Sequence, residues 1–382
     1  MKYLSIFVAL FMVVAYFSAC SATSQPVCCA RLPSSGEMKC MPGGAQYMDI
    51  SKGICNLLMC SPLDLKMIIQ GIMRNIRPLP TALAKKASEE LNETSNDVQF
   101  YLDSLRHWLT RQRHLKSRTQ DQFLIAFLRG SKFSLEKCKQ KIESFYTYRV
   151  LMPELFKDRD VDDPKVYEIL KLGSMLHLPQ PISEDGPRVI MLRFGNIDFH
   201  RFKVVEVFKV GIMMADLCLY DDDNAIVAGY VVVVDLANVT PFHLFNFDPI
   251  FAKKITVMTN KVLPSRMKGF HFINMLPAVQ KCFNMVKGVI NEKLRNRFYF
   301  HGNNLNNLYE HVPKHCFPVE YGGKSETIQD ILDNWEIKLK KHKEFFIEED
   351  EYGCNNKLRE DRASVVDQFF GINGSFRKLT ID

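Results

Sequence analysis

The residue types that usually carry chemistry occur in this chain, but not at the spacings that a catalytic site requires. The chain has no G-x-S-x-G, no H-E-x-x-H and no G-x-G-x-x-G after a strand. Gly322-Gly323-Lys324-Ser325 ends like a phosphate-binding loop, but Pro318 stands where such a loop begins with Gly. We therefore expect a protein that is not an enzyme and that has no cofactor.

Two groups of possible metal ligands are better explained as turns or loops. His311 and His315-Cys316 have a spacing that zinc ligands use, but Pro313 lies between the histidines and no second pair follows. The acidic run at 221–223 lacks the remaining ligands of a calcium loop and is typical of a solvated loop. We expect no metal site.

The strongest chemical signal is a basic segment between Lys253 and Arg297. It contains ten Lys or Arg residues and one acidic residue, Glu292, so its net charge of +9 exceeds the +7 of the whole chain. Each Lys or Arg near an anionic membrane is worth about 1 kcal/mol. Nucleic acid favours the same charge, and a solvated basic surface needs no partner. Charge alone leaves all three interpretations open.

Apolar helices within and beside this segment predict either a cavity or a buried core. The chain has 28 Phe and 17 Met, which suit an adaptable apolar interior. A helix expected over 202–219 is apolar nearly all round, and one expected over 277–290 has more apolar surface than one core-facing stripe needs. The pattern does not choose between a cavity lining and simple burial.

The elements that must position these residues alternate between strand and helix after residue 160. Strands are expected over 188–194, 229–236, 269–274 and 298–301, and helices over 202–219, 249–262 and 277–290. This alternation predicts a largely parallel sheet with crossover helices. Residues 73–157 have helical patterns, and the sequence from 325 onward is helical, then polar and loose.

The first 72 residues differ in composition from the rest. Lys2 precedes a long apolar run and small residues follow at 19–22, which is typical of a secretory signal or an anchor. Six of the eleven cysteines lie in the first 60 residues, and five are scattered singly, as in a reducing compartment. Sequons at Asn92, Asn238 and Asn373 matter only if the chain is secreted. We interpret residues 1–22 as signal-like and 23–72 as an appended segment outside the fold.

Four stretches of the chain resemble one known family. They are FLIAFLRGSKFSLEKCKQKIESFYTYRVLMPELF, VVVVDLANVTPFHLFNFDP, LPSRMKGFHFIN and EKLRNRFYFHGNNLNNLYEHVPKHCFPVEYGG. In order and in type they resemble the CRAL-TRIO family, in particular its group of alpha-tocopherol transfer protein, cellular retinaldehyde-binding protein and insect relatives. The resemblance runs from about Met73 to about Lys341.

The resemblance implies an α/β fold with a mostly parallel sheet. A small all-α CRAL-TRIO N-terminal domain would occupy residues 73–157, and a lipid-binding domain would occupy 158–325. A mobile helix that gates the pocket in this family corresponds to about 277–290. Residues 326–382 would then form a helical and later loose C-terminal tail.

The resemblance also implies a site for phosphoinositide headgroups and a lipid pocket. The headgroup site corresponds to Arg266, Lys268, Lys293 and Arg297. A further arginine of the group falls on Ser131, and the adjacent Lys132 is expected to substitute for it. The pocket is expected to be lined by Phe208, Gly211, Ile212, Met214, Ala215, Val233, Phe270, Phe272, Phe283 and Val286.

The expected pocket is less polar than one that holds tocopherol. Two serines that help to bind tocopherol in the family correspond to Gly211 and Ala215, so tocopherol itself is not implied. A retinoid, a sterol-like or isoprenoid lipid and an acyl-chain lipid remain open.

Together, the residues and the resemblance predict a monomeric carrier that transfers a hydrophobic lipid between membranes and docks on phosphoinositides. We expect it in the cytoplasm, peripheral on membranes, without a nucleic-acid partner. One alternative is a phosphoinositide-binding adaptor that moves no cargo. Another is an extracellular carrier, if the N-terminal signal operates.

Overall fold

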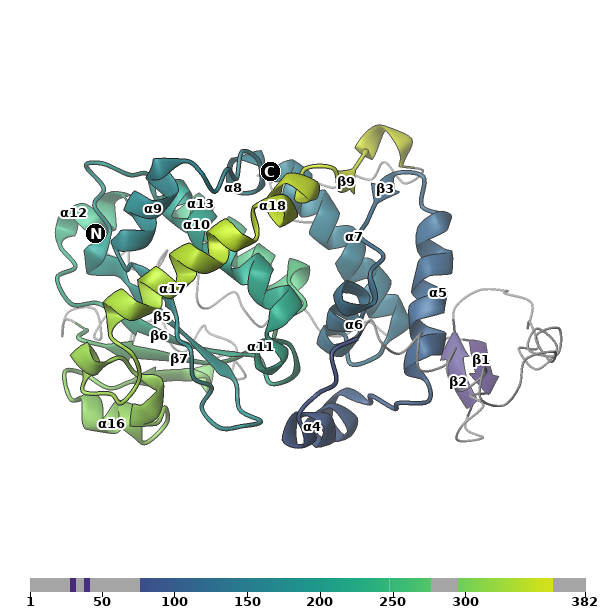
Figure 1. Ribbon diagram of the computed structural model, residues 1–382, viewed down its shortest axis with the longest axis horizontal. Helices are drawn as coiled ribbons and strands as arrows, with labels where there is room; N and C mark the ends of the chain where they lie inside the picture. The colour runs from purple at the N-terminus through teal and green to yellow at the C-terminus, as the bar shows by residue number, and fades with distance from the viewer. Residues whose placement is uncertain (1–27, 32–37, 42–75, 247, 276–294, 360–382) are drawn as a thin grey trace, which may run out of the picture.

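The structure is a computed structural model of the 382-residue chain, and it describes residues 28–31, 38–41, 76–246, 248–275 and 295–359. A helical part and an α/β part lie side by side (Figure 1). Residues 1–27, the predicted gate helix at 277–290 and Lys293 lie outside the described residues. Within the Cys-rich segment, β1 (Cys28–Arg31) and β2 (Met38–Met41) form an antiparallel pair.

A five-stranded sheet forms the centre of the α/β part, in the order β4-β5-β6-β7-β8. Strands β5 to β8 are parallel, as the alternation of strand and helix predicts, while β4 pairs antiparallel with β5. The strands are β4 (Met175–His177), β5 (Arg188–Arg193), β6 (Tyr230–Asp235), β7 (Met267–Ile273) and β8 (Phe298–Phe300). Every residue of β6 is buried, which explains its continuous apolar sequence.

Within the five-stranded sheet of the described residues, β4 is the strand that the sequence did not predict. It is three residues long and lies at the edge of the sheet. Three residues are too few to display an alternating pattern, so its sequence carries no strand signal.

The helices of the α/β part surround this sheet. They are α9 (Pro164–Lys171), α10 (Val204–Asp221), α11 (Asp223–Val227), α12 (Pro241–Asn246), α13 (Pro249–Val257), α16 (Leu305–Tyr309), α17 (Ile328–Lys341) and α18 (Lys343–Glu349). Helix α13 begins as predicted: the Asp248 carboxylate accepts a hydrogen bond from the Ile250 amide at 2.8 Å, and Pro249 takes the first position. A π-helical turn, Met258–Val262, follows it.

The helical part shares one hydrophobic core with α10 and α13. Its helices are α4 (Thr81–Leu91), α5 (Val98–Thr110), α6 (Asp121–Gly130), α7 (Leu135–Leu151) and α8 (Pro153–Phe156). Phe123, Phe127 and Phe145 of this part cluster with Ile212 of α10 and Phe251 of α13. The predicted domain boundary near residue 157 therefore separates the two parts along the sequence, but the hydrophobic core continues across it.

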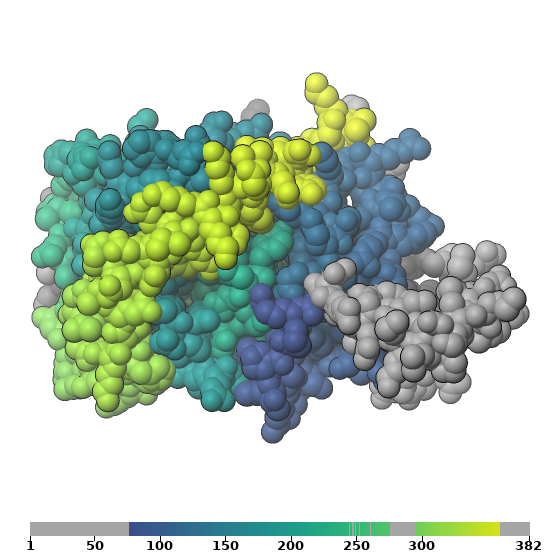
Figure 2. Space-filling view, viewed as in Figure 1, coloured from purple at the N-terminus to yellow at the C-terminus, as the bar shows by residue number. Residues whose placement is uncertain are grey.

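The C-terminal segment returns to the helical part. The short strand β9 (Gly353–Cys354) pairs with β3 (Leu115–Lys116), and Figure 2 shows the segment as a band that crosses from the α/β part. The expectation of a loose tail is thus wrong for residues up to 359. Arg359 donates to Glu143 and Thr147 of α7.

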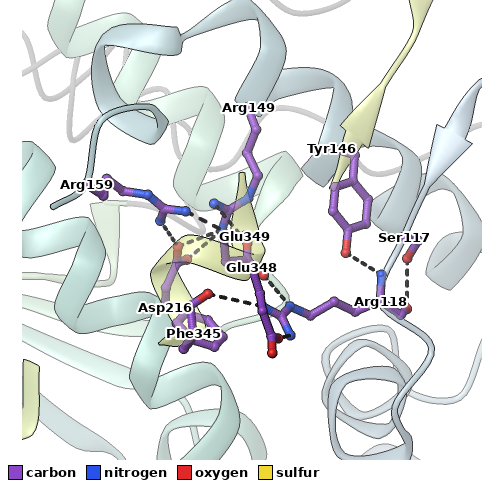
Figure 3. A network of polar contacts seen from close by, with 9 residues as sticks. All are labelled: Ser117, Arg118, Tyr146, Arg149, Arg159, Asp216, Phe345, Glu348 and Glu349. Atoms are coloured by element: carbon purple, nitrogen blue, oxygen red, sulfur yellow. Dashed lines mark hydrogen bonds and ion pairs between the residues drawn. The ribbon is translucent and has the colours of Figure 1, made fainter. Parts of the chain in front are cut away.

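A buried ionic network, drawn in Figure 3, ties α18 to the helical part. Arg149 of α7 donates twice to Asp216 of α10, at 2.7 and 2.8 Å, and Arg159 donates to the same carboxylate at 2.6 Å. Arg118 forms an ion pair with Glu349 of α18. Helix α18 is therefore held by charge as well as by apolar packing.

Candidate functional site

The pairing register separates the two faces of the sheet. Residues that pair across neighbouring strands point to the same side, so the register aligns Ile190 with Val232 and Val232 with Phe270. We call this side the apolar face. Its apolar residues are Met175, Ile190, Leu192, Val232, Val234, Phe270, Phe272, Phe298 and Phe300, and His177, which pairs with Ile190, lies on the same side at the edge strand.

The apolar face is shielded from water and lacks charge at its centre. Val232 is 3% exposed and Phe272 is 4% exposed. Five of its members pack in one cluster, which Leu236 and Met275 extend. The described residues of this cluster belong to the strands and to the loops that adjoin them. It is a continuous surface of aliphatic and aromatic groups, which matches the chemistry of a hydrophobic ligand.

The opposite face packs against helices instead. Val231 and Val233 alternate with Val232 along β6 and lie in a cluster with residues of α9, α10 and α17, including Met214. The predicted pocket lining therefore does not come together as one surface. Phe270 and Phe272 share the apolar face, whereas Val233 and Met214 belong to the opposite side, because a strand alternates its side chains with a period of two.

The predicted pocket residues of α10 are also divided. Phe208 and Ile212 pack into the core shared with the helical part, where Phe208 meets Phe251 with ring centroids 5.3 Å apart. Gly211 lies against the apolar face: a Cβ at this position would be 2.1 Å from the Met175 sulfur. Ala215 is partly exposed in a stretch of the helix that is otherwise buried. Phe283 and Val286 lie outside the described residues.

The predicted headgroup residues that the structure describes lie close together. Arg266 Nη1 is 3.2 Å and Lys268 Nζ is 3.6 Å from the same oxygen of Glu90, in α4. Arg297 donates to the carbonyl of Met267 at 3.0 Å. We call Lys132, Arg266, Lys268 and Arg297 the basic cluster.

The backbone of Lys132 lies near the end of α4, in an unusual loop between α6 and α7. Lys132 and Phe133 both have a positive φ, 53° and 55°, a region that residues other than Gly rarely adopt. Phe133 packs edge-on against Tyr101, and the Lys132 carbonyl accepts from the Asn92 side chain at 3.4 Å. Asn92 follows Glu90 by two residues, so the loop and the end of α4 converge on the basic cluster.

The electrostatics of the basic cluster are dominated by burial and by like charge. Burial lowers the pKa of Lys268, and repulsion by Arg266 and Lys86 adds to that, while Glu90 opposes it. Burial acts to raise the pKa of Glu90, but attraction to Lys268 and Arg266 outweighs it and the pKa lies below its ordinary value. The cluster therefore has an excess of positive charge around one carboxylate.

Large apolar side chains are exposed in the segment that follows β6. Phe242 is 41%, Phe245 57% and Ile250 66% exposed. They come from α12 and the start of α13, within ten residues of sequence. These residues form a candidate surface for contact with a membrane or a partner.

The motifs that the sequence analysis set aside are structural. Lys314–Cys316 is a 3-10 turn, as expected, and His315 and Cys316 both contact the carbonyl of Pro181. His311 packs beside His271 and His301. No group of His, Cys, Asp or Glu within the described ranges is arranged to hold a metal ion.

The acidic run at 221–223 is not the solvated loop that we expected. Asp222 pairs with Arg188 at 2.6 Å and accepts from the Ala225 amide to begin α11. Asp223 is largely buried and pairs with Arg77 at 2.6 Å. The prediction failed because the partners of these carboxylates come from distant parts of the chain.

A separate pocket of about 220 Å³ lies beside Trp335 of α17. Its lining includes His177 and Cys218, whose Nδ1 and Sγ atoms are 3.7 Å apart. Burial lowers the pKa of His177 to about 3 and raises that of the Cys218 thiol. Both groups are therefore neutral near pH 7, which does not provide a reactive thiolate.

Similarity to known proteins agrees with this arrangement. Residues 182–323 match the CRAL/TRIO domain, and residues 94–166 match the Pinta-like, UBA domain. The alpha-tocopherol transfer protein-like protein of Mus musculus is 27% identical over 271 residues, which cover 70% of this chain and 76% of that protein. Clavesin-2 of Rattus norvegicus is 27% identical over 240 residues, covering 63% and 73%. A crystal structure of Sfh5 aligns with a TM-score of 0.40 and 13% identity, over 67% of this chain and 92% of that one.

Two further features bear on the site. The helices in the described part of the chain include none that is long and apolar enough to cross a bilayer. Glu90, which contacts two residues of the basic cluster, was missed by the sequence analysis. Its contact with Arg266 joins residues 176 positions apart, and no local pattern could have revealed it.

Proposed function

Because this chain belongs to the CRAL-TRIO family of lipid-binding and lipid-transfer proteins, we propose that it is a non-enzymatic carrier of one small hydrophobic lipid. The apolar face is the observation that carries this proposal. A lipid against that face would exchange contact with water for contact with aliphatic and aromatic groups. The favourable free energy of this burial is about 25 cal/mol per Å² of apolar surface. The proposed cargo is a retinoid, an isoprenoid or a similar lipid, because the face presents rings and branched chains.

The position of Gly211 narrows the shape of the proposed pocket. Met175 approaches α10 at this residue and occupies space that any side chain at position 211 would need. A hydroxyl at position 211, such as the family's tocopherol-binding serine, would collide with Met175. The proposed pocket is therefore closed by a thioether at this point, and it offers no hydroxyl there to bind a polar ligand group.

We propose that the carrier docks on phosphoinositide-containing membranes through the basic cluster. Lys268 and Arg297 would bind headgroup phosphates, with Lys293 added from outside the described residues. Phe245 and Ile250 would enter the interface, since exposed apolar groups suit the boundary between headgroups and acyl chains. The buried cysteines Cys138, Cys218, Cys316 and Cys354 are free thiols, which favours the cytoplasmic side.

A second candidate function is a phosphoinositide-binding adaptor whose pocket stays filled. The low exposure of Val232 and Phe272 favours it, because protein atoms already cover the apolar face and a lipid could exchange there only if that cover moved. Such a protein would bind membranes and move no lipid between them.

One experiment separates the two candidates. The chain is purified from cells of its natural source, and lipid that copurifies is identified by native mass spectrometry and extraction. Transfer of that lipid between donor and acceptor vesicles is then followed in the presence and absence of phosphatidylinositol bisphosphate. A single lipid at about one per chain that is transferred supports the carrier, while membrane binding without transfer supports the adaptor.

The docking step is tested with charge-reversal variants. Lys268→Glu and Arg297→Glu should each reduce binding to phosphoinositide vesicles several-fold. Lys340→Glu makes the same change of charge on α17, far from the basic cluster in sequence and half-exposed, and should have little effect. Equal binding of all three variants would contradict docking through the basic cluster.

A further inference from the structure

We propose that Glu90 competes internally for the anion that the basic cluster binds, and that it thereby raises the number of phosphate contacts that a headgroup needs in order to bind. This inference rests on the proposed docking function. Glu90 belongs to α4 in the helical part, and it lies outside both the basic segment and the apolar face.

The contacts of Glu90 are those that a phosphate oxygen would make. One carboxylate oxygen lies 3.2 Å from Arg266 Nη1 and 3.6 Å from Lys268 Nζ. Arg266 directly precedes β7 and Lys268 is the second residue of that strand, and the carboxylate is placed between the two cations. Carboxylate and phosphate oxygens are bound by Arg and Lys in the same way, so Glu90 and a headgroup would use the same two donors.

The accessibility of these groups makes the competition reversible. The side chains of Glu90 and Lys268 are 40% and 39% exposed, whereas that of Arg266 is 17% exposed. Arg266 also donates to the carbonyl of Val227, which anchors it independently of Glu90. An incoming anion could therefore displace Glu90 while Arg266 stays in place.

An incoming anion must interact with Arg266 and Lys268 more strongly than Glu90 does in order to bind. A single phosphate would replace one carboxylate by a group of similar or slightly greater charge, so the gain would be small. A headgroup with a second phosphate would keep that exchange and also engage Arg297 or Lys132. Glu90 would thus lower both affinities by a similar factor, and the headgroup with the second contact would keep enough affinity to bind.

An alternative role for Glu90 predicts the opposite result. If Glu90 only held Arg266 and Lys268 in the geometry that binds phosphate, its neutralisation would reduce the affinity. The sign of the change therefore distinguishes competition from positioning.

The test compares Glu90→Gln with Glu89→Gln in the full chain. The two variants change the net charge equally on the same helix, but Glu89 is 64% exposed and pairs with Lys85 at 3.9 Å, away from the basic cluster. Binding is measured to phosphatidylcholine vesicles that contain phosphatidylinositol 4-phosphate or phosphatidylinositol 4,5-bisphosphate, and also to soluble inositol 1,4,5-trisphosphate.

Glu90→Gln should raise the affinity for the monophosphate vesicles about fivefold, or about 1 kcal/mol, and the affinity for the bisphosphate by a similar factor. Glu89→Gln should change either by less than about twofold, and adding Lys268→Gln to Glu90→Gln should abolish most of the gain. Equal effects of the two Glu variants, or a loss of affinity for Glu90→Gln, would overturn the proposal.

Binding of soluble inositol 1,4,5-trisphosphate tests this inference independently of membrane docking. If no variant binds vesicles, the docking proposal fails. Competition for a free phosphate compound is still supported if Glu90→Gln gains more affinity for inositol trisphosphate than Glu89→Gln does. If Glu90→Gln gains nothing with either probe, the inference fails whatever the outcome for docking.

Discussion

Asp216 is the most sensitive point of the buried network in Figure 3. The side chains of Asp216 and Arg159 are each 1% exposed and that of Arg149 is 8% exposed. Asp216→Asn keeps the shape of the side chain and removes its charge. Arg149 and Arg159 would then retain Glu349 as a buried anion, at 3.5 and 4.0 Å, which is farther than their contacts with Asp216.

The expected cost follows from the burial of these charges. Removing one partner of a buried ion pair costs about 3–5 kcal/mol, because the remaining charge stays desolvated. A domain has a total stability of about 5–15 kcal/mol, so the loss is a large fraction of the whole. Since the helical part and α10 share one core, both parts should lose stability together.

Urea unfolding followed by circular dichroism and by Trp fluorescence measures this loss. The control is Glu168→Gln, which removes a surface pair with Arg201 whose side chains are 51% and 58% exposed. That change should cost less than about 1 kcal/mol. If Asp216→Asn stays within about 1 kcal/mol of the wild type, the reasoning about this network is refuted, since the arginines would have found equivalent partners.

Three other predictions follow from the described residues. Burial lowers the pKa of His177 and His271 to about 3, below about 6.5 for an unfolded histidine. Stability should therefore fall as the pH drops below about 6.5, by about 1.4 kcal/mol per histidine between pH 7.5 and 5.5. His301, His311 and Tyr299 face His271. Urea midpoints of His177→Gln and His271→Gln should each depend less on pH than that of the wild type, and an unchanged dependence would count against the assignment. Ile250→Ser should weaken vesicle binding, while Ile337→Ser, at the same 66% exposure, should not; equal loss in cosedimentation would exclude a specific role for Ile250. Gly130→Ala should destabilise by about 1–3 kcal/mol, because its Cβ would lie 2.0 Å from the Pro264 carbonyl, whereas Gly353→Ala meets its nearest atom at 3.8 Å and should be tolerated; equal urea midpoints for the two variants would refute the steric argument.

Local sequence was sufficient for most of the elements. The uninterrupted apolar run of β6 predicted a strand buried on both faces, and Asp248 with Pro249 predicted the start of α13. Both signals depend only on neighbouring residues, through side-chain periodicity and the capping of free amides. The concentration of basic charge near residues 266–268 was likewise visible in the sequence.

The proposed lipid site was only partly predictable from the sequence. The family resemblance pointed to Phe270 and Phe272, which do share the apolar face. It also grouped them with Val233, which the register aligns with His271 on the opposite face. Periodicity shows that Val232 and Val233 point to opposite sides, but only the pairing with neighbouring strands shows which of them faces Phe270.

The amino-acid sequence by itself determined α10, α13, the parallel strands and the location of the basic segment, because these depend on contacts over a few residues. The tertiary structure alone decided the edge strand β4, the return of β9 to β3 and the pairing of Glu90 with Arg266. It also decided the ion pair between Arg118 and Glu349, which are 231 residues apart. Electrostatic attraction and strand pairing act over a few ångströms in space, and the fold brings those residues together from positions that no local pattern connects.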